Sequence, residues 1–319
     1  MSERSGGARE ATPGRACQAG AAMTEPVAPA GTAATSGRLR RVAAMVVVGV
    51  LLLASCAAAE RAPDDAAGRA TRGPRTSAPP VQRLRVKVLG TLPHDSGAFT
   101  EGLEIAGGRL YEATGISGQS SVRAGPAGRK PTVRAALPAP LFGEGITVLG
   151  RTLWQLTWRD RIAVERDART LAELRRVPYP GEGWGMCLQR TRHRLVTSDG
   201  SARLTFRDPR TLARTGGVAV TEAGRPVTQL NELECVGAAV YANVLFTDRI
   251  VRIDPATGAV TASVDASGLL RDDELVPGST LNGIAAVPGT DQFLITGKFW
   301  PRMFRVVFVP AGRTSGSGR

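Results

Sequence analysis

One short motif occurs five times along the chain, as Glu101-Gly102-Leu103, Glu144-Gly145-Ile146, Trp184-Gly185-Met186, Leu233-Glu234-Cys235 and Asn282-Gly283-Ile284. Its middle residues lie at positions 102, 145, 185, 234 and 283, so the repeat is 40 to 49 residues long. A period of this length is typical of β-propellers, in which each repeat forms one blade of about four strands. The repeat therefore predicts an all-β fold, a five-bladed β-propeller.

The segments between the motifs support this prediction. Each motif leads to a second apolar strand, such as 110–114, and then to a strand in which apolar and polar residues alternate, such as 249–253. Turns such as 254–258 (DPATG) follow, because proline and glycine set the backbone of turns. We expect the strand at 84–89, which precedes the first repeat, to close the ring as the outer strand of the last blade.

The first residue of each motif is expected to start the innermost strand of a blade. Neighbouring strands crowd together there, and glycine permits close approach of two backbones. The five lead residues should form a ring at one mouth of the central channel, where a pocket is expected. They are Glu101, Glu144, Trp184, Leu233 and Asn282.

The start of the chain has the composition of an export signal. Residues 1–37 are rich in Ala, Gly, Ser, Thr and Pro and are expected to be a disordered extension. Residues 38–55 join a basic patch to an apolar run that is short for a membrane span and suits a signal peptide. The run ends in Leu53-Ala54-Ser55-Cys56, which resembles the lipobox of bacterial lipoproteins, so Cys56 is the expected lipidation site.

This order of features predicts an exported cell-envelope lipoprotein that is anchored to the membrane through its lipid. Residues 56–82 lack periodicity and are expected to be a flexible tether. The propeller is expected at 83–312 and a disordered tail at 313–319. The alternative is an ordinary secretion signal that happens to contain a cysteine.

Charge and cysteine usage limit the partners. The formal net charge is +13, but the arginines are scattered and aromatic residues are only 5%, so we expect no nucleic-acid partner. We also expect the protein to be a monomer.

The repeat register places Cys235 at the position of Met186, next to Cys187, on the inner strands of neighbouring blades. A disulfide between them and two separate buried thiols both remain open at this stage.

The sequence lacks several common catalytic signatures. Phosphate-binding loops and nucleophile elbows are absent. The two histidines are far apart and cannot form a histidine-based metal site; His94 is interpreted as structural and His193 as a surface residue. We expect no metal in the site and no cofactor, although a structural calcium ion held by backbone oxygens in the channel stays open.

Several motifs, spread over roughly residues 86–308, resemble those of the plant and bacterial glutamine cyclotransferases and occur in the family's order. They are Pro93-His94-Asp95, Ala98-Phe99-Thr100-Glu101-Gly102, Phe142-Gly143-Glu144-Gly145, Leu153-Trp154-Gln155-Leu156-Thr157-Trp158, Glu182-Gly183-Trp184-Gly185, Leu230-Asn231-Glu232, Ala242-Asn243-Val244, Leu281-Asn282-Gly283 and Thr296-Gly297-Lys298.

The resemblance implies a glutaminyl-peptide cyclotransferase. Such an acyltransferase cyclises the N-terminal glutamine of peptides or proteins to pyroglutamate, releases ammonia and needs no catalytic zinc. On matching positions, Glu144 and Lys298 would be the catalytic residues. The substrate-binding residues would be Phe99, Glu101, Phe142, Trp158, Trp184, Asn231 and Leu245. The chain departs from the family at two of them, because the family usually has glutamine at the position of Glu101 and tryptophan at that of Leu245.

The reaction suits a single carboxylate. The amine and the carboxamide are already joined, so the enzyme mainly selects the reactive conformer. One carboxylate can take a proton from the attacking amine and return it to the departing group. Without the family resemblance, the better interpretation is that Glu144 satisfies backbone amides of the inner strands and that Trp158 and Trp184 pack between blades.

Two other functions remain open from the sequence. A catalytically weak or inactive propeller lipoprotein would bind peptides or cell-wall ligands, which the departures at Glu101 and Leu245 favour. A metal-dependent propeller hydrolase, such as a lactonase, would need Glu101, Glu144, Glu232 and Asn282 to converge on one ion.

Overall fold

The computed structural model describes residues 80–312. The expected N-terminal extension, the signal peptide, the lipidation site Cys56, nearly all of the tether and the tail at 313–319 lie outside these residues. Within them, no helix is long and apolar enough to cross a membrane.

The described residues form twenty-two β-strands and two short 3-10 helices, which confirms the all-β prediction. The elements are β1 (Gln82–Pro93), β2 (Thr100–Ala106), β3 (Arg109–Thr114), β4 (Ser121–Gly125), β5 (Val133–Ala136), β6 (Gly143–Leu149), β7 (Thr152–Thr157), β8 (Ile162–Asp167), β9 (Glu173–Pro178), β10 (Met186–Gln189), η1 (Arg190–Arg192), β11 (Arg194–Thr197), β12 (Arg203–Arg207), β13 (Arg214–Ala219), β14 (Thr221–Glu222), β15 (Arg225–Pro226), β16 (Leu230–Val236), β17 (Ala239–Val244), β18 (Arg249–Ile253), β19 (Val260–Asp265), η2 (Asp272–Glu274), β20 (Thr280–Ala286), β21 (Phe293–Lys298) and β22 (Arg302–Pro310).

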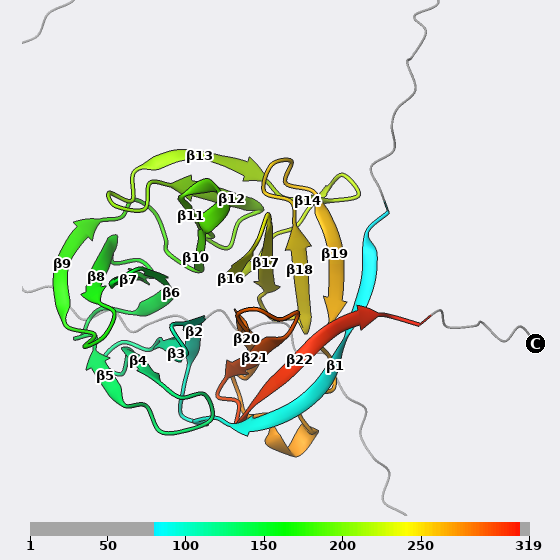
Figure 1. Cartoon of the computed structure of the whole chain (residues 1–319), viewed down its shortest axis with the longest axis horizontal. Helices are drawn as coiled ribbons and strands as arrows, with labels where there is room; N and C mark the ends of the chain where they lie inside the picture. Colours follow the sequence, from blue (N-terminus) through cyan, green and yellow to red (C-terminus); the bar gives the residue numbers. More distant parts are fainter. Residues whose placement is uncertain (1–79, 313–319) are drawn as a thin grey trace, which may run out of the picture. The chain divides into compact units, whose positions relative to one another are not determined.

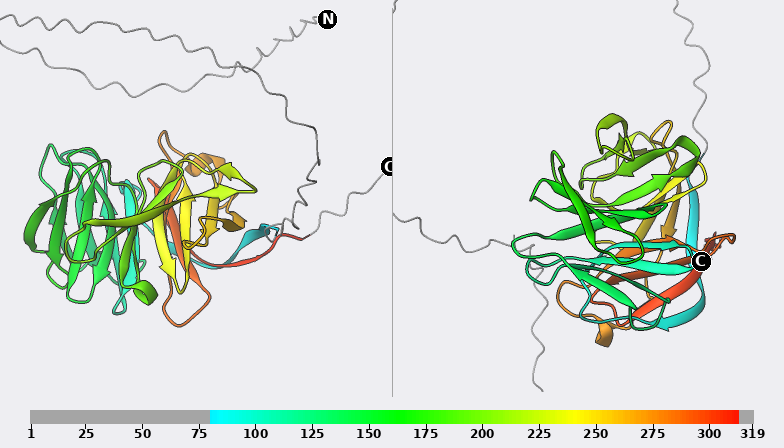
Figure 2. Two further views of the ribbon diagram at one scale, coloured as in Figure 1. Left: turned by 90° about the horizontal axis from the view of Figure 1, so that it is seen from above. Right: turned by 60° about the vertical axis from the view of Figure 1, so that its left-hand side comes forward.

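The strands assemble into sheets that surround a common centre (Figure 1 and Figure 2). Three sheets are four-stranded, in the orders β2-β3-β4-β5, β6-β7-β8-β9 and β10-β11-β12-β13, and β14 pairs with β15. The remaining eight strands form one sheet in the order β16-β17-β18-β19-β1-β22-β21-β20. The first strand of each four-strand run, namely β2, β6, β10, β16 and β20, lies toward the centre (Figure 1).

The strand that precedes the first repeat joins the two ends of the folded region. β1 pairs antiparallel with β22 from Leu84 to Pro93, and parallel with β19 from Gln82 to Arg85. The first and last strands therefore run side by side at the rim (Figure 1). This confirms the prediction that an N-terminal strand supplies the outer strand beside the last repeat.

Apolar side chains fill the spaces between neighbouring sheets. One cluster includes Val196 and Phe206 of one sheet with Leu233 and Val251 of the next. Each inner strand thus has its neighbours fixed on both sides, and the residues at its end are held on a rigid support.

Glycines let the inner strands approach one another closely. A Cβ atom on Gly145 would lie 2.4 Å from the carbonyl oxygen of Trp184, and one on Gly185 would lie 2.1 Å from that of Asn231. The Gly145 N–H donates to this same Trp184 oxygen at 2.7 Å. Any side chain at these glycines would push neighbouring strands apart, which explains the middle residue of the repeated motif.

The hydrogen-bond register corrects the fourth copy of the motif. Leu103, Ile146 and Leu233 occupy equivalent places, each three residues before the last pair of its hairpin. Leu233 is therefore the third residue of its motif, and the prediction that it leads the motif was wrong. The true copy is Asn231-Glu232-Leu233, which was obscured because Glu232 stands where the other copies have glycine.

Glu232 compensates for the missing glycine by bonding to backbone. Its Oε1 accepts a hydrogen bond from the Leu103 N–H at 3.3 Å, and its Oε2 accepts one from the Ile284 N–H at 2.8 Å. Burial, followed by the charge of Glu234, raises the pKa of Glu232 well above its usual value. The carboxyl group thus serves to satisfy buried amides of two other inner strands.

Cys187 and Cys235 form a disulfide, which decides between the two alternatives left open by the sequence. The bond links β10 to β16, and the two Cα atoms are 5.4 Å apart. In the corrected register Cys235 matches Leu188 and not Met186, but it still lies on the inner strand next to that of Cys187.

Removing this disulfide should destabilise the fold. The bond spans 48 residues, and a cross-link of that span restricts the unfolded chain by about 4 kcal/mol on the chain-entropy model. We expect Cys187→Ser/Cys235→Ser to lose about 2–5 kcal/mol of unfolding free energy in urea titrations without reductant. Wild type with reductant is the control and should match the variant. An unchanged denaturation midpoint would contradict this expectation.

Candidate active site

Glu144 is a buried carboxyl group that lacks a partner. It lies at the start of β6 and is 5% exposed. Its Oε2 atom has no hydrogen-bond partner, which is rare for a buried oxygen. Burial, then the charge of Glu101, raises the pKa of Glu144 well above its usual value, although Lys298 opposes this. Such a group is suited to accept and return a proton near neutral pH.

Glu101 forms a buried ion pair with Lys298. The Lys298 Nζ atom lies 2.5 Å from Glu101 Oε1, and both side chains are almost fully buried. The Asn282 side-chain amide donates to the other oxygen of Glu101 at 3.2 Å and to the Thr100 carbonyl at 2.9 Å. Burial raises the pKa of Glu101, and the ammonium of Lys298 partly offsets this. The departure from glutamine at position 101 therefore gives Lys298 a counter-charge inside the site.

A row of aromatic rings stands beside these charges. Lys298 Nζ lies 4.2 Å from the centre of the Phe99 ring. Phe99 meets Phe142 edge-on at 6.1 Å between ring centres, and Phe142 meets Trp158 at 5.5 Å. On its other side Phe99 contacts Phe299 at 5.1 Å. These rings form an apolar wall that lowers the local dielectric around the buried carboxyl groups.

Glu182 holds the two tryptophans in position. The indole N–H groups of Trp158 and Trp184 both donate to Glu182 Oε2, at 3.0 and 3.1 Å. The Arg159 side chain donates to Glu182 Oε1 at 2.9 Å and lies over the Trp158 ring at 4.0 Å. Burial opposes ionisation, but the bonds from Trp184, Arg159 and Trp158 hold the pKa of Glu182 below its usual value. Both indole rings are therefore oriented by one carboxylate.

Asn231 is placed next to Trp184 by the corrected register. Its carbonyl oxygen accepts from the Ser198 hydroxyl at 2.6 Å, and Ser198 Oγ in turn accepts from the Gly185 N–H at 2.8 Å. The Asn231 side chain is 2% exposed, and its Oδ1 atom has no partner. The Oδ1 atom of Asn282 is also buried without a partner. Two amide oxygens are thus free to accept hydrogen bonds from a bound ligand.

His94 connects the loop that follows Lys298 to the first sheet. Its Nε2 atom donates to Glu112 at 2.9 Å, and its Nδ1 atom donates to the Trp300 carbonyl at 2.7 Å. Burial opposes the charge, but the bond to Glu112 and the charge of Glu112 outweigh it and raise the pKa of His94. The structural interpretation of His94 is thus confirmed, and His193 is exposed, as expected.

Leu245 directly follows β17 and makes none of the side-chain contacts described above. It is half-buried, and its backbone N–H donates to the Gln229 carbonyl at 2.9 Å. The next residue, Phe246, is 78% exposed. No ring occupies position 245, where the family usually has tryptophan.

Two of the carboxyl groups considered for a metal site already have partners within the protein. Within residues 80–312, no group of three or more His, Cys, Asp or Glu side chains is placed to hold a metal ion. Glu101 is bound to Lys298, and Glu232 is bound to backbone amides. These contacts account for two of the four residues that a metal-dependent hydrolase would need.

The structure adds two residues to the predicted site. Glu182 orients both indoles, and Phe299 extends the aromatic wall next to Lys298. Glu182 belongs to the same motif as Trp184, and Phe299 follows Lys298 directly in the sequence. This nearness in the sequence is the signal that could have identified both residues. Of the predicted residues, Leu245 is not joined to the others by these contacts, and Glu144 is linked to Glu101 and Lys298 only through the effect of their charges on its pKa.

Comparisons with known proteins identify the family of the chain. The chain matches the family model of glutamine cyclotransferase over residues 50–308. It is 34% identical to a glutaminyl-peptide cyclotransferase of Arabidopsis thaliana over 239 residues, 73% of this chain and 74% of the plant protein. The crystal structure of Myxococcus xanthus glutaminyl cyclase matches with a TM-score of 0.68 and 36% identity, covering 73% of this chain and 100% of that chain. The chain therefore belongs to the glutamine cyclotransferase family.

Proposed function

We propose that this chain is a glutaminyl-peptide cyclotransferase, an acyltransferase that converts the N-terminal glutamine of peptides to pyroglutamate and ammonia. The observation that carries the proposal is the buried Glu144 carboxyl group, whose Oε2 atom has no partner and whose pKa is affected by the charges of Glu101 and Lys298. Family membership supports the same activity.

The α-amine of the bound peptide attacks the side-chain carboxamide carbon of the same glutamine. As the new C–N bond forms, Glu144 takes a proton from the attacking nitrogen. It then gives this proton to the carboxamide NH₂ group, the old C–N bond breaks, and ammonia leaves. The same carboxyl group ends the cycle as it began, so no second acid or base is required.

The other residues hold the substrate for this step. Lys298, paired with Glu101, stabilises charge on the carboxamide oxygen as the tetrahedral intermediate forms. The Oδ1 atoms of Asn231 and Asn282 accept N–H groups of the substrate. The rings of Phe142, Trp158 and Trp184, together with Phe99, exclude water and enclose the glutamine side chain.

Ammonia release from a glutamine-initiated dipeptide by the purified chain tests this function. We expect release from the dipeptide with a free amine and none from the N-acetylated dipeptide, because acetylation removes the nucleophile. The rival proposal, a propeller lipoprotein that only binds peptides, predicts binding of the dipeptide without ammonia release.

We also propose that the fold is a five-bladed propeller. The three four-stranded sheets would be three blades, and β16-β17-β18-β19 and β20-β21-β22-β1 would be the other two, joined through β1 and β19. Five inner strands then surround the channel. Their lead residues, with the corrected register, are Glu101, Glu144, Trp184, Asn231 and Asn282.

Substituting Leu245 with tryptophan should strengthen substrate binding. The larger ring would add apolar area at the position where the family usually has tryptophan, and a buried ring contributes more than leucine does. We expect KM for a glutamine dipeptide to fall by about threefold to tenfold, with a smaller change in kcat. Leu245→Met is the control for a change of shape without a ring. A KM that stays the same or rises would remove this position from the site.

We propose that the protein is exported and anchored to the membrane through a lipid on Cys56. The support is the ordered basic patch, apolar run and Leu53-Ala54-Ser55-Cys56 sequence. Wild type should fractionate with membranes and lose residues 1–55, whereas Cys56→Ala should remain unprocessed at that position. Immunoblots of the fractions and intact mass measure both results, and identical processing of the two proteins would contradict the lipid anchor.

A further inference from the structure

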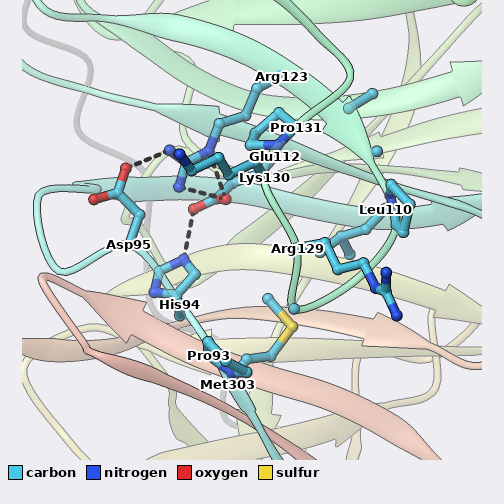
Figure 3. A pocket seen from close by; sticks show the side chains of 14 residues that line it. Pro93, His94, Asp95, Leu110, Glu112, Arg123, Arg129, Lys130, Pro131 and Met303 are labelled. Carbon is cyan, nitrogen blue, oxygen red and sulfur yellow. Dashed lines mark hydrogen bonds and ion pairs between the residues drawn. The ribbon is translucent and has the colours of Figure 1, made fainter.

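One cavity opens beside Phe99 of the aromatic wall, and a second cavity shares two lining residues with it. The smaller, about 270 Å³, is lined by Phe99, Gly115 and Arg134 among others. The larger, about 460 Å³, lies between the first sheet and β22, and its lining includes Arg129 and Lys130 (Figure 3). Apart from Phe99, no residue that lines either cavity takes part in the reaction described above.

One ion pair belongs to the walls of both cavities, so the cavities adjoin, and the two taken together are named the path. Asp95 and Arg123 line each cavity, and Arg123 donates to Asp95 at 2.6 Å (Figure 3). The bond from Arg123 holds the pKa of Asp95 below its usual value, so Asp95 is ionised and its charge is matched. Arg123 also bonds to the buried Glu112. The shared wall therefore carries little net charge of its own.

Three other cations along the path have no acidic partner. Arg129, Lys130 and Arg134 are exposed, and none of them forms an ion pair within the part of the chain that the structure describes. The lining of the larger cavity also includes the apolar side chains of Leu110 and Met303 (Figure 3). A ligand that complements this path would be an acidic chain with apolar parts.

The path begins at the proposed active site. Phe99 lines the smaller cavity, and the same ring lies 4.2 Å from Lys298 Nζ and contacts Phe142. Gly115, also in that lining, leaves no room for a side chain, because a Cβ atom there would lie 2.5 Å from the Phe142 ring and 3.1 Å from Glu101 Cγ. A peptide whose N-terminal glutamine enters the site can thus leave it over Phe99 and reach the cations.

We propose that the two cavities bind the residues that follow the N-terminal glutamine and select acidic residues there. This inference rests on the proposed function, because it concerns the remainder of the same substrate. The preference is electrostatic, so it adds to the affinity for peptides and leaves the reaction of a dipeptide unaffected.

Two peptides of equal length test the proposal, one with glutamate and one with serine at the positions after the first two residues. Exposed ion pairs are individually weak, so three of them together should give the wild-type chain about a tenfold higher kcat/KM for the acidic peptide at low salt. High salt should remove the preference, because exposed charges are screened. The variant Arg129→Glu/Lys130→Glu/Arg134→Glu should lose it while keeping wild-type kcat/KM for a neutral dipeptide.

The matched control reverses three exposed arginines elsewhere, as Arg192→Glu/Arg214→Glu/Arg225→Glu, with the same change in net charge. It should keep most of the preference. Equal kcat/KM for the two peptides, or an equal loss in the control, would overturn the proposal. If wild type cyclised neither peptide, the proposed function would fail. Calorimetric titration of the acidic peptide into wild type and the first variant would then still decide whether these cavities bind it.

Discussion

Replacing Glu144 with glutamine should lower kcat for a glutamine dipeptide by about 100- to 10,000-fold. General acid–base groups contribute that range, and the amide cannot take the proton from the attacking amine. KM should change little, because the side chain keeps its shape. Steady-state ammonia release measures both constants.

The pH profile should identify the same group. Burial and the charge of Glu101 raise the pKa of Glu144, so wild-type activity should fall on the acid side at a pH above the usual carboxyl range. Glu101 and Glu144 interact, so this limb reports the pair of carboxyl groups. The residual activity of Glu144→Gln should lack this limb. A variant with unchanged kcat and an unchanged acid limb would show that Glu144 is not the proton shuttle.

Loss of activity in this variant should not reflect loss of folding. The pKa of Glu144 is higher in the folded chain than in the unfolded chain. Its contribution to stability is therefore fully present below the unfolded pKa and is lost as pH rises through the folded pKa. Glutamine does not titrate, so the variant should be at least as stable as wild type at neutral pH. Thermal denaturation measures this.

Replacing Lys298 with alanine should reduce both stability and activity. The substitution leaves the Glu101 carboxyl group buried without its cation, and breaking a buried pair costs about 3–5 kcal/mol. It should also lower kcat by about 10- to 100-fold, less than the Glu144 substitution, because one charged group beside the oxyanion is lost. Since Lys298 lowers the pKa of Glu144, the acid limb should move to higher pH in the variant.

A second substitution separates the two effects. Glu101→Gln/Lys298→Ala removes both charges, so it should regain most of the lost stability while kcat stays low. Urea titrations and ammonia release on the single and double variants complete a cycle. If the double variant were as unstable as Lys298→Ala, or as active as wild type, the pair would not have the role described.

The sequence was sufficient for the strand content and for most of the site. The repeated motif predicted inner strands whose lead residues gather at one place. The structure does link Glu101, through Lys298, and Trp184, through Glu182, to the aromatic wall, and the charges of Glu101 and Lys298 act on Glu144. It misplaced the fourth copy, because Glu232 occupies the glycine position and hides the repeat. Only the hairpin register showed that Asn231 is the lead residue.

Side-chain pairings were harder to predict, because they depend on the directions of residues far apart in the chain. Lys298 and Glu101 are separated by 197 residues, and nothing in either motif alone indicates that they pair. The two indoles share Glu182 only because separate strands bring Trp158 and Trp184 to the same carboxylate. Such contacts follow from packing between sheets and not from local patterns.

The mass of the product tests the central claim most directly. A glutamine-initiated peptide is incubated with purified wild type and, in parallel, with Glu144→Gln, and the products are analysed by mass spectrometry. We predict that wild type yields a product that has lost one ammonia and gained no water, which is pyroglutamate, and that Glu144→Gln yields almost none. An unchanged peptide with wild type, or a product that has also gained water and is therefore glutamate, would contradict the account.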